Sequence, residues 1–142
     1  YHAAAIRSDG FVFTCGSNSN GQLGDGTTVA KSTFVQAVGI SNAVAVSVGN
    51  YHTIVLRSDG AVFSSGSNVN GQLGNNSTTS TSTFVQAIGI SNAVSVIDGL
   101  DNNSIALRSD GFVFAVGDDS NGELGQNTTY QNKSTFVKVI GI

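Results

Sequence analysis

The 142-residue sequence contains no proline, methionine or tryptophan, and it has a single cysteine. One cysteine, Cys15, excludes an intrachain disulfide and any metal cluster built on thiolates. Its place in the alternating run 11–15 favours a small buried hydrophobic residue over a reactive thiol. No stretch approaches the roughly 20 apolar residues of a membrane helix, so we expect no membrane insertion.

Charge is also scarce, at 11% of residues, with a net charge of −3. Basic and acidic side chains balance up to residue 90, so the whole negative excess lies after it. No basic stripe is present that could follow a phosphate backbone, and nucleic acid is therefore not an expected partner. Serine, threonine and asparagine instead supply the polar surface, with 45 residues. With many β-branched residues and few helix formers, this composition predicts an all-β fold.

The sequence repeats itself at offsets of 50 and 51 residues. Each unit predicts four short strands, of which the first is clearest at 43–48 and 93–97. The second strands are expected at 2–7, 52–57 and 103–108, the third at 11–15, 61–65 and 112–116, and the fourth at 32–40, 82–90 and 134–142. A period near 50 with four strands per unit is typical of propeller blades.

Two glycine-containing segments recur in every unit and predict turns. Ser-Asp-Gly lies between the second and third strands, where Asp-Gly predicts a tight primed hairpin turn and a structural role for the arginine before it. The second segment, Gly-Ser-Asn-Ser-Asn-Gly-Gln-Leu-Gly at 16–24 and its two copies, predicts the exit from the third strand, with Leu23 in the core. The predicted turn residues are Asp9, Gly10, Asp59, Gly60, Asp110, Gly111, Gly16, Gly21, Gly66, Gly71, Gly117 and Gly122.

The segment 16–24 also has the glycine spacing of a phosphate-binding loop. A nucleotide-binding loop needs Lys and then Ser or Thr directly after its second glycine. Gln22 and Leu23 occupy those positions. The segment also occurs three times, as a structural turn would, so we expect neither a nucleotide nor any other cofactor.

Apolar residues on both faces of the second and third strands indicate sheets covered on both sides, as in a propeller. The combined pattern of His, Ser-Asp-Gly and Gly-x-Asn-x-x-Gly-Gln-Leu-Gly resembles the regulator of chromosome condensation repeat over nearly the whole chain. The resemblance implies blades of a seven-bladed propeller, in a family that includes exchange factors for small GTPases and secreted inhibitors. The sequence departs from the family pattern at Cys15, Ser65 and Val116, where an aromatic residue is usual, and it lacks the usual proline near Phe34, Phe84 and Phe136.

We therefore predict a single repeat array over 1–142, with blade 1 at 1–40, blade 2 at 41–90 and blade 3 at 91–142. Blade 1 begins at its second strand and so lacks the first. Three blades are too few to close a ring. We expect a window from a longer repeat protein, or a subunit that completes a ring or filament with other copies, through edges that would otherwise stay unpaired.

Candidate chemical sites are few. His2 and His52 occupy matching positions, with Asn103 in the third unit, and we expect hydrogen-bonded residues at strand starts rather than catalytic or metal-binding ones. The third unit is irregular, and its Asp118 and Asp119 are candidate Ca²⁺ ligands, although the spacing of a calcium loop is lacking and a solvated acidic loop is the alternative. Five N-x-S/T sequences are candidate glycosylation sites, namely Asn75, Asn76, Asn102, Asn127 and Asn132.

Low charge, abundant Ser, Thr and Asn and unpaired ends favour a non-enzymatic structural, assembly or adhesive module of an extracellular or cell-surface protein. Its expected partners are neighbouring repeats or other copies of the chain. The alternative is an intracellular or secreted protein-binding propeller, similar to an exchange factor or an inhibitor. In that case the variable connections before each fourth strand would contact the partner.

Overall fold

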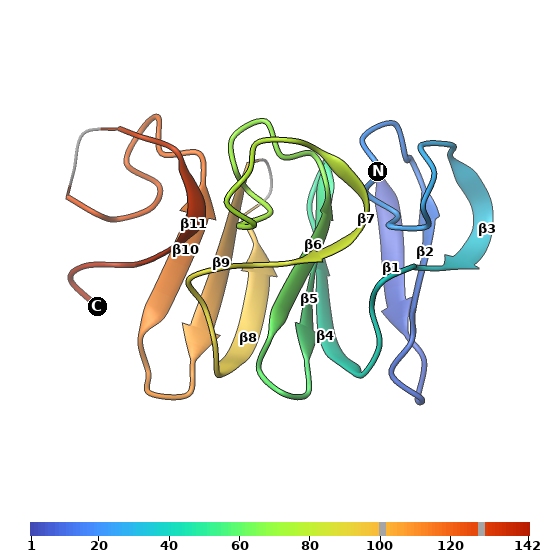
Figure 1. Ribbon diagram of the computed structural model, residues 1–142, viewed down its shortest axis with the longest axis horizontal. Helices are drawn as coiled ribbons and strands as arrows, with labels where there is room; N and C mark the ends of the chain where they lie inside the picture. Colours follow the sequence, from blue (N-terminus) through green and yellow to red (C-terminus); the bar gives the residue numbers. More distant parts are fainter. Residues whose placement is uncertain (100–101, 128–129) are drawn as a thin grey trace.

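The computed structural model covers residues 1–142 and describes all of them except 100–101 and 128–129. Three antiparallel sheets stand side by side along the chain (Figure 1). The first sheet contains β1 (His2–Ile6), β2 (Val12–Gly16) and β3 (Lys31–Gln36). The second contains β4 (Ala43–Val48), β5 (His52–Arg57), β6 (Val62–Gly66) and β7 (Thr81–Gln86). The third contains β8 (Ala93–Asp98), β9 (Asn103–Arg108), β10 (Val113–Gly117) and β11 (Lys133–Lys138).

Within each sheet, neighbours in sequence are neighbours in space, and all paired strands are antiparallel. A short hairpin loop joins β1 to β2, β5 to β6 and β9 to β10, whereas the connection before the last strand of each sheet is long. The first sheet has three strands and the other two have four, as the repeat predicts. The three sheets lie within residues 1–40, 41–90 and 91–142. The fourth strands are shorter than expected, because they end at Gln36, Gln86 and Lys138, before the following Gly-Ile turn. The described residues contain no helix long and apolar enough to cross a membrane.

The hairpins between the second and third strands differ in type from the prediction. Gly10 N–H donates to the Arg7 carbonyl at 2.8 Å, and Arg7 N–H donates to the Phe11 carbonyl at 2.9 Å. The loop thus has three residues, and only its glycine, at φ 82°, has a positive φ. This is a type I turn closed by a glycine bulge, not a two-residue primed turn. Asp9 serves the turn through its side chain, which accepts hydrogen bonds from Arg7 and the Phe11 amide.

The hydrophobic core lies between the sheets rather than within one of them. One cluster, which includes Val12, Val55 and Phe84, fills the space between the first and second sheets. The other, which includes Ile54, Ala106 and Phe136, fills the space between the second and third. The second sheet is consequently buried on both faces, and every residue of β6 is buried. Leu23, Leu73 and Leu124 follow Gly-Gln or Gly-Glu in the segments 16–24, 66–74 and 117–125, which we call the corners. All three are fully buried, as predicted for Leu23.

Among the residues that the structure describes, none of the other sheets packs on the outward face of the first sheet. Ala3 and Ala5 are exposed there, and Cys15 pairs with Ala3 in the sheet register. Cys15 is a free thiol of intermediate burial, so the prediction of a buried residue is wrong. Its counterpart Ser65 is buried, because in the second sheet the same face packs against the first.

A substitution at Gly66 tests how closely the corner at 66–74 packs against the start of β5. Its φ is 114°, and a β-carbon added there would lie 2.7 Å from the His52 α-carbon. Replacing Gly66 by Ala should lower the free energy of unfolding by about 3 kcal/mol or more, because strain and a backbone clash add. Gly26→Ala is the control, since Gly26 has φ 83° but no atom within 4 Å of an added β-carbon. It should cost only about 1 kcal/mol in urea unfolding; equal losses would contradict the packing described.

Candidate partner-binding surfaces

A buried chain of hydrogen bonds links each sheet to the next. Between the first two sheets, the Thr53 hydroxyl donates to the Gln22 carbonyl at 2.7 Å. The Thr53 hydroxyl oxygen also lies 2.7 Å from His2 Nε2. Because the only proton of this hydroxyl is already donated to Gln22, His2 must be the donor in the second bond. This chain of imidazole, hydroxyl and carbonyl thus links β1 and the segment 16–24 of the first sheet to β5 of the second. We call the boundary between two neighbouring sheets a joint.

The second joint repeats this chain with different residues. Ser104 donates to the Gln72 carbonyl at 3.0 Å, and His52 Nε2 lies 2.9 Å from the Ser104 oxygen. Ser104 therefore replaces Thr53, and His52 replaces His2. The prediction that both histidines are hydrogen-bonded residues at strand starts is confirmed.

The second joint also holds a buried contact between aspartate and histidine that the sequence pattern did not predict. Asp98 Oδ2 lies 2.9 Å from His52 Nε2, and the two side chains are 1% and 0% exposed. The Asp98 backbone N–H donates to Ser47 Oγ, 3.1 Å away. The matching position in the second sheet is Val48, so the joint between the first two sheets lacks this contact. Polar side chains buried this deeply require close polar partners.

His52, Asp98 and Ser104 resemble the composition of a hydrolase triad, but their geometry differs. In a triad, the carboxylate and the nucleophile meet different nitrogens of the imidazole. Here both the carboxylate and the hydroxyl meet Nε2, in a cluster that is buried between two sheets. The arrangement joins sheets and offers no substrate access.

A phenylalanine from the last strand of the second sheet, and one from the last strand of the third, fill the outer part of these joints. Phe84 N–H donates to the Val38 carbonyl at 3.2 Å, and Phe136 N–H donates to the Ile88 carbonyl at 2.9 Å. The two rings pack on the preceding sheet and their residues are 5% and 4% exposed. Phe34, at the same position of the first sheet, is 52% exposed. Its exposure follows from its place on a sheet with no neighbour on that side.

The turns at the upper edge of Figure 1 are held by buried asparagines. Asn68 accepts from the Leu73 amide at 2.9 Å, and its Nδ2 donates to the carbonyls of Ser77 and Thr79 at 2.9 and 3.1 Å. Asn18 forms the matching bonds in the first sheet. In the first two sheets, the variable connection is thus fastened to the preceding corner by an asparagine side chain, which holds the loop in place.

The third sheet carries Asp119 in place of this asparagine. Its Oδ1 accepts from the Leu124 amide at 3.0 Å, but a carboxylate cannot donate to the loop carbonyls. Asp119 is 1% exposed, whereas Asp118 is partly exposed and accepts from the Ser120 amide. Among the residues described, no group of three His, Cys, Asp or Glu side chains is placed to hold a metal ion. Part of the irregular connections, 100–101 and 128–129, lies outside the described residues.

The candidate glycosylation sites differ in accessibility. Asn76 is exposed. Asn75 and Asn102 are partly buried and accept hydrogen bonds from Asn68 and Gln72. Asn132 is exposed and bonds both the Asp119 amide and the Asn70 side chain. Asn127 is exposed, but Thr128 and Thr129 of its acceptor sequence lie outside the described residues.

The lower edge is formed by the hairpins, where each arginine pairs with the turn aspartate. Arg57 also lies over the Phe63 ring, 5.0 Å from its centroid, and Arg7 and Arg108 make the same contact with Phe13 and Phe114. Hydrogen bonding to Arg57 lowers the pKa of Asp59 to about 2. These pairs are exposed and contribute little to stability. They confirm the structural role predicted for the arginines.

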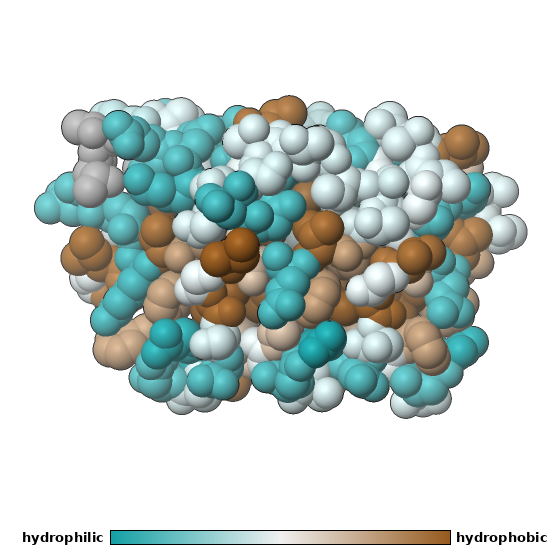
Figure 2. Space-filling view, viewed as in Figure 1, coloured by the Kyte–Doolittle hydropathy of each residue, from teal (hydrophilic) through white to brown (hydrophobic). Residues whose placement is uncertain are grey.

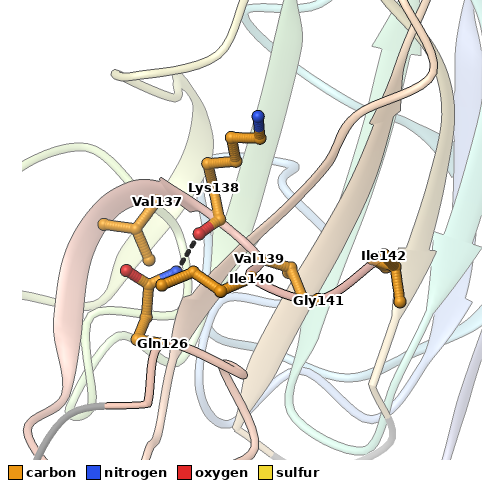
Figure 3. Close-up of a pocket in the computed structure, with 7 residues that line it drawn as sticks. All are labelled: Gln126, Val137, Lys138, Val139, Ile140, Gly141 and Ile142. Atoms are coloured by element: carbon orange, nitrogen blue, oxygen red, sulfur yellow. Dashed lines mark hydrogen bonds between the residues drawn. The ribbon is translucent and has the colours of Figure 1, made fainter.

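Two hollows lie at the third sheet. One, of about 390 Å³, is lined by polar residues that include Asn103, Asp118 and Glu123. The other, of about 540 Å³, is formed by Gln126 and residues 137–142, with Gln126 Nε2 donating to the Lys138 carbonyl (Figure 3).

Figure 2 shows hydrophobic residues gathered in a band across the middle of one face, between a lower edge rich in hydrophilic residues and a mostly pale or hydrophilic upper edge.

Solved structures share this arrangement of sheets. Prp20p from Saccharomyces cerevisiae matches with a TM-score of 0.87 and 17% identity, over 99% of this chain and 36% of its own. Human WBSCR16 matches with 0.85 and 22%, over 97% and 37%. Yeast RCC1 (Prp20), with Kap60 bound, matches with 0.85 and 17%, over 99% and 35%. The three sheets are therefore blades of a β-propeller, and the chain spans about a third of the length of these proteins.

The sequence comparison identifies the repeats. The model of the regulator of chromosome condensation (RCC1) repeat matches residues 9–56, and a second model of this repeat matches residues 43–72. The chain carries RCC1 repeats, as its sequence pattern predicts. A comparison with curated protein sequences finds no match.

Asn68 tests how the upper-edge loops are fastened. In an Asn68→Asp variant, a buried carboxylate would face the carbonyls that the amide now bonds. We expect a loss of about 3 kcal/mol in the free energy of urea unfolding. Asn70→Asp is the control, because Asn70 receives a bond from Asn132 through its oxygen, which Asp retains. A loss of the same size in both variants would contradict the role of Asn68.

His2 makes stability depend on pH. Burial, with smaller effects of the chain's amino terminus and His52, lowers its pKa from 6.5 to about 4. Between these values the unfolded state takes up a proton that the folded state does not, so stability falls as the pH falls. His2→Asn should reduce the loss between about pH 7 and about pH 5 by about 1 to 2 kcal/mol, allowing for partial exposure. Denaturant unfolding of both proteins at the two pH values measures this; an unchanged pH dependence would refute it.

Proposed function

We propose that the chain is part of a protein-binding RCC1-type propeller and that its partner contacts the upper edge. Fold similarity supports this proposal, since Prp20p was described together with its binding to Gsp1p and histones and a related structure holds Kap60. Those partners belong to those proteins, and for this chain only the class of ligand, a protein, is proposed. The proposal favours the binding alternative of the sequence analysis over the adhesive one.

The observation that carries it is the chemistry of the upper-edge surface, which we define as the corners 16–24, 66–74 and 117–125 with the connections that follow them. Val29, Val69 and Tyr130 are 63%, 66% and 68% exposed on this surface, among Ser, Thr and Asn residues. Exposed apolar and aromatic anchors within a polar surround are typical of protein interfaces. Asn132 bonds Asn70 of the neighbouring sheet, which makes the surface continuous across two blades.

The loops of the first two sheets are also held in place. Gly26 N–H donates to the Ser82 carbonyl at 2.8 Å and Asn76 N–H to the Ser134 carbonyl at 2.7 Å, so each of these two loops is bonded to the next sheet. Loops held in this way lose little conformational entropy on binding. We infer a protein-binding surface here, and the non-enzymatic role expected from the sequence stays a prediction.

A second candidate function is assembly, through neighbouring repeats or other copies of the chain. A neighbouring repeat or copy would cover the outward face of the first sheet, where Ala3, Ala5 and Phe34 are exposed. An extracellular or cell-surface location would agree with exposed acceptor sequences such as that of Asn76. This location and the use of the five asparagines remain proposals.

A paired substitution tests the upper-edge surface. Val69→Ser with Tyr130→Ser removes two exposed anchors without touching either joint. Val94→Ser with Ile88→Ser is the control, since these residues are 54% and 51% exposed but lie outside the upper-edge surface. In affinity purification from native cells with quantitative mass spectrometry, the first pair should reduce partner recovery about tenfold or more. Retention by the first variant, or equal loss in the control, would argue against this surface.

A further inference from the structure

The connection between the corner at 66–74 and β7 carries two overlapping acceptor sequences for N-linked glycans. The first is Asn75-Asn76-Ser77 and the second is Asn76-Ser77-Thr78. Asn76 and Thr78 are exposed, whereas Asn75 and Ser77 are partly buried. The second sequence therefore offers both its amide and its hydroxyl to solvent.

The backbone at Asn76 is held in a bend. Its φ is 60°, in the left-handed region that asparagine adopts more readily than most residues. The Asn76 N–H donates to the Ser134 carbonyl of the third sheet at 2.7 Å. Asn68 fastens the same loop through the carbonyls of Ser77 and Thr79. None of these bonds uses the Asn76 side chain, so a group attached to it leaves the loop fastened.

The other four candidate asparagines are less suited to modification. Three of them hold neighbouring segments through hydrogen bonds of their side chains, namely Asn75, Asn102 and Asn132. A glycan needs space around the amide that these bonded neighbours occupy. The acceptor sequence of Asn127 lies partly outside the described residues. Within the described part of the chain, Asn76 alone combines an exposed amide that makes no side-chain hydrogen bond with an exposed hydroxyl two residues later.

We propose that Asn76 is a site of N-glycosylation, with a lipid-linked oligosaccharide as the sugar donor. In this transfer the Asn76 amide nitrogen forms a bond to the anomeric carbon of the first sugar, and the bond from that carbon to the diphosphate of the donor breaks. The lipid diphosphate leaves, and one amide proton is released to solvent. Thr78 supplies the hydroxyl that the acceptor sequence requires. The site belongs with the extracellular or cell-surface location proposed above.

A glycan at Asn76 would regulate the upper-edge surface, to which this connection belongs. An N-linked glycan is bulky and strongly hydrated, and it would stand over the second blade. A protein partner would be excluded from that blade, so the glycosylated form and the partner-bound form are alternatives. This consequence rests on the function proposed above, whereas the site itself does not.

Secretion of the 142-residue chain from cultured eukaryotic cells, behind an added cleavable signal sequence, tests the site. The signal sequence delivers the chain to the glycosylating compartment, so the result is independent of the native location. Enzymatic deglycosylation in heavy-oxygen water labels each asparagine that carried a glycan, and peptide mass spectrometry should find the label at Asn76 in most secreted molecules. A chain without label at Asn76, or with equal label at Asn75, Asn102 or Asn132, would overturn the assignment.

The overlap between the two acceptor sequences supplies matched variants. Thr78→Ala removes the acceptor hydroxyl of Asn76 and keeps that of Asn75, so it should abolish the label at Asn76. Ser77→Ala does the reverse and should leave that label unchanged. Secreted chain and chain retained in the cells are both analysed, so that a variant that is not secreted still gives a result. The opposite pattern in the two variants would place the glycan on Asn75 and refute the proposal.

The same two variants separate the site from its consequence. In affinity purification from native cells, unglycosylated Thr78→Ala should recover several-fold more partner than glycosylated Ser77→Ala. Equal recovery of a partner that depends on Val69 and Tyr130 would refute regulation by the glycan and leave the upper-edge surface in place. Failure of both variants to recover a partner would argue against the proposed function and leave the site at Asn76 intact.

Discussion

A sheet with apolar side chains on both faces must be covered on both sides, and this constraint shapes the molecule. Only the second sheet meets it within the described chain, through the cores that it shares with its two neighbours. The buried hydrogen bonds that join histidine, hydroxyl and carbonyl are directional, unlike the hydrophobic contact beside them. They fix the height and rotation of one sheet against the next, which apolar contact alone would leave variable.

The same constraint explains why equivalent residues have different environments. Phe34, Phe84 and Phe136 have identical local sequences, Ser-Thr-Phe-Val, yet the first is half-exposed and the others are buried. The difference lies in what stands beside each sheet. Stability in such an array is close to a sum of nearest-neighbour terms, so the second sheet, with two joints, is the most stable part.

Much of this architecture could be predicted from the sequence, because its determinants are local. The 50-residue period, the alternating strands, the turn glycines and the buried Leu23 all follow from short patterns, and the structure confirms them. The hairpin type was wrong, since Asp-Gly also suits a three-residue loop in which only the glycine has a positive φ. Sequence alone does not distinguish the two loops, which depend on how the flanking strands are paired.

Contacts between repeats were beyond sequence reasoning. Asp98 stands where the second unit has Val48, and nothing in the local pattern indicates that it meets His52 across a joint. Whether the side chain of Cys15 is buried also depends on a neighbouring sheet rather than on the strand that contains it.

Ion pairs within the first two blades also shape the electric field around the protein. Arg7, Lys31 and Arg57 each pair with a nearby aspartate, so the first two blades have almost no net field at a distance. The net charge of −3 therefore arises from the third blade. The molecule is a dipole with its negative end at that blade, and in dilute salt a basic partner would approach that end first, before any specific contact forms.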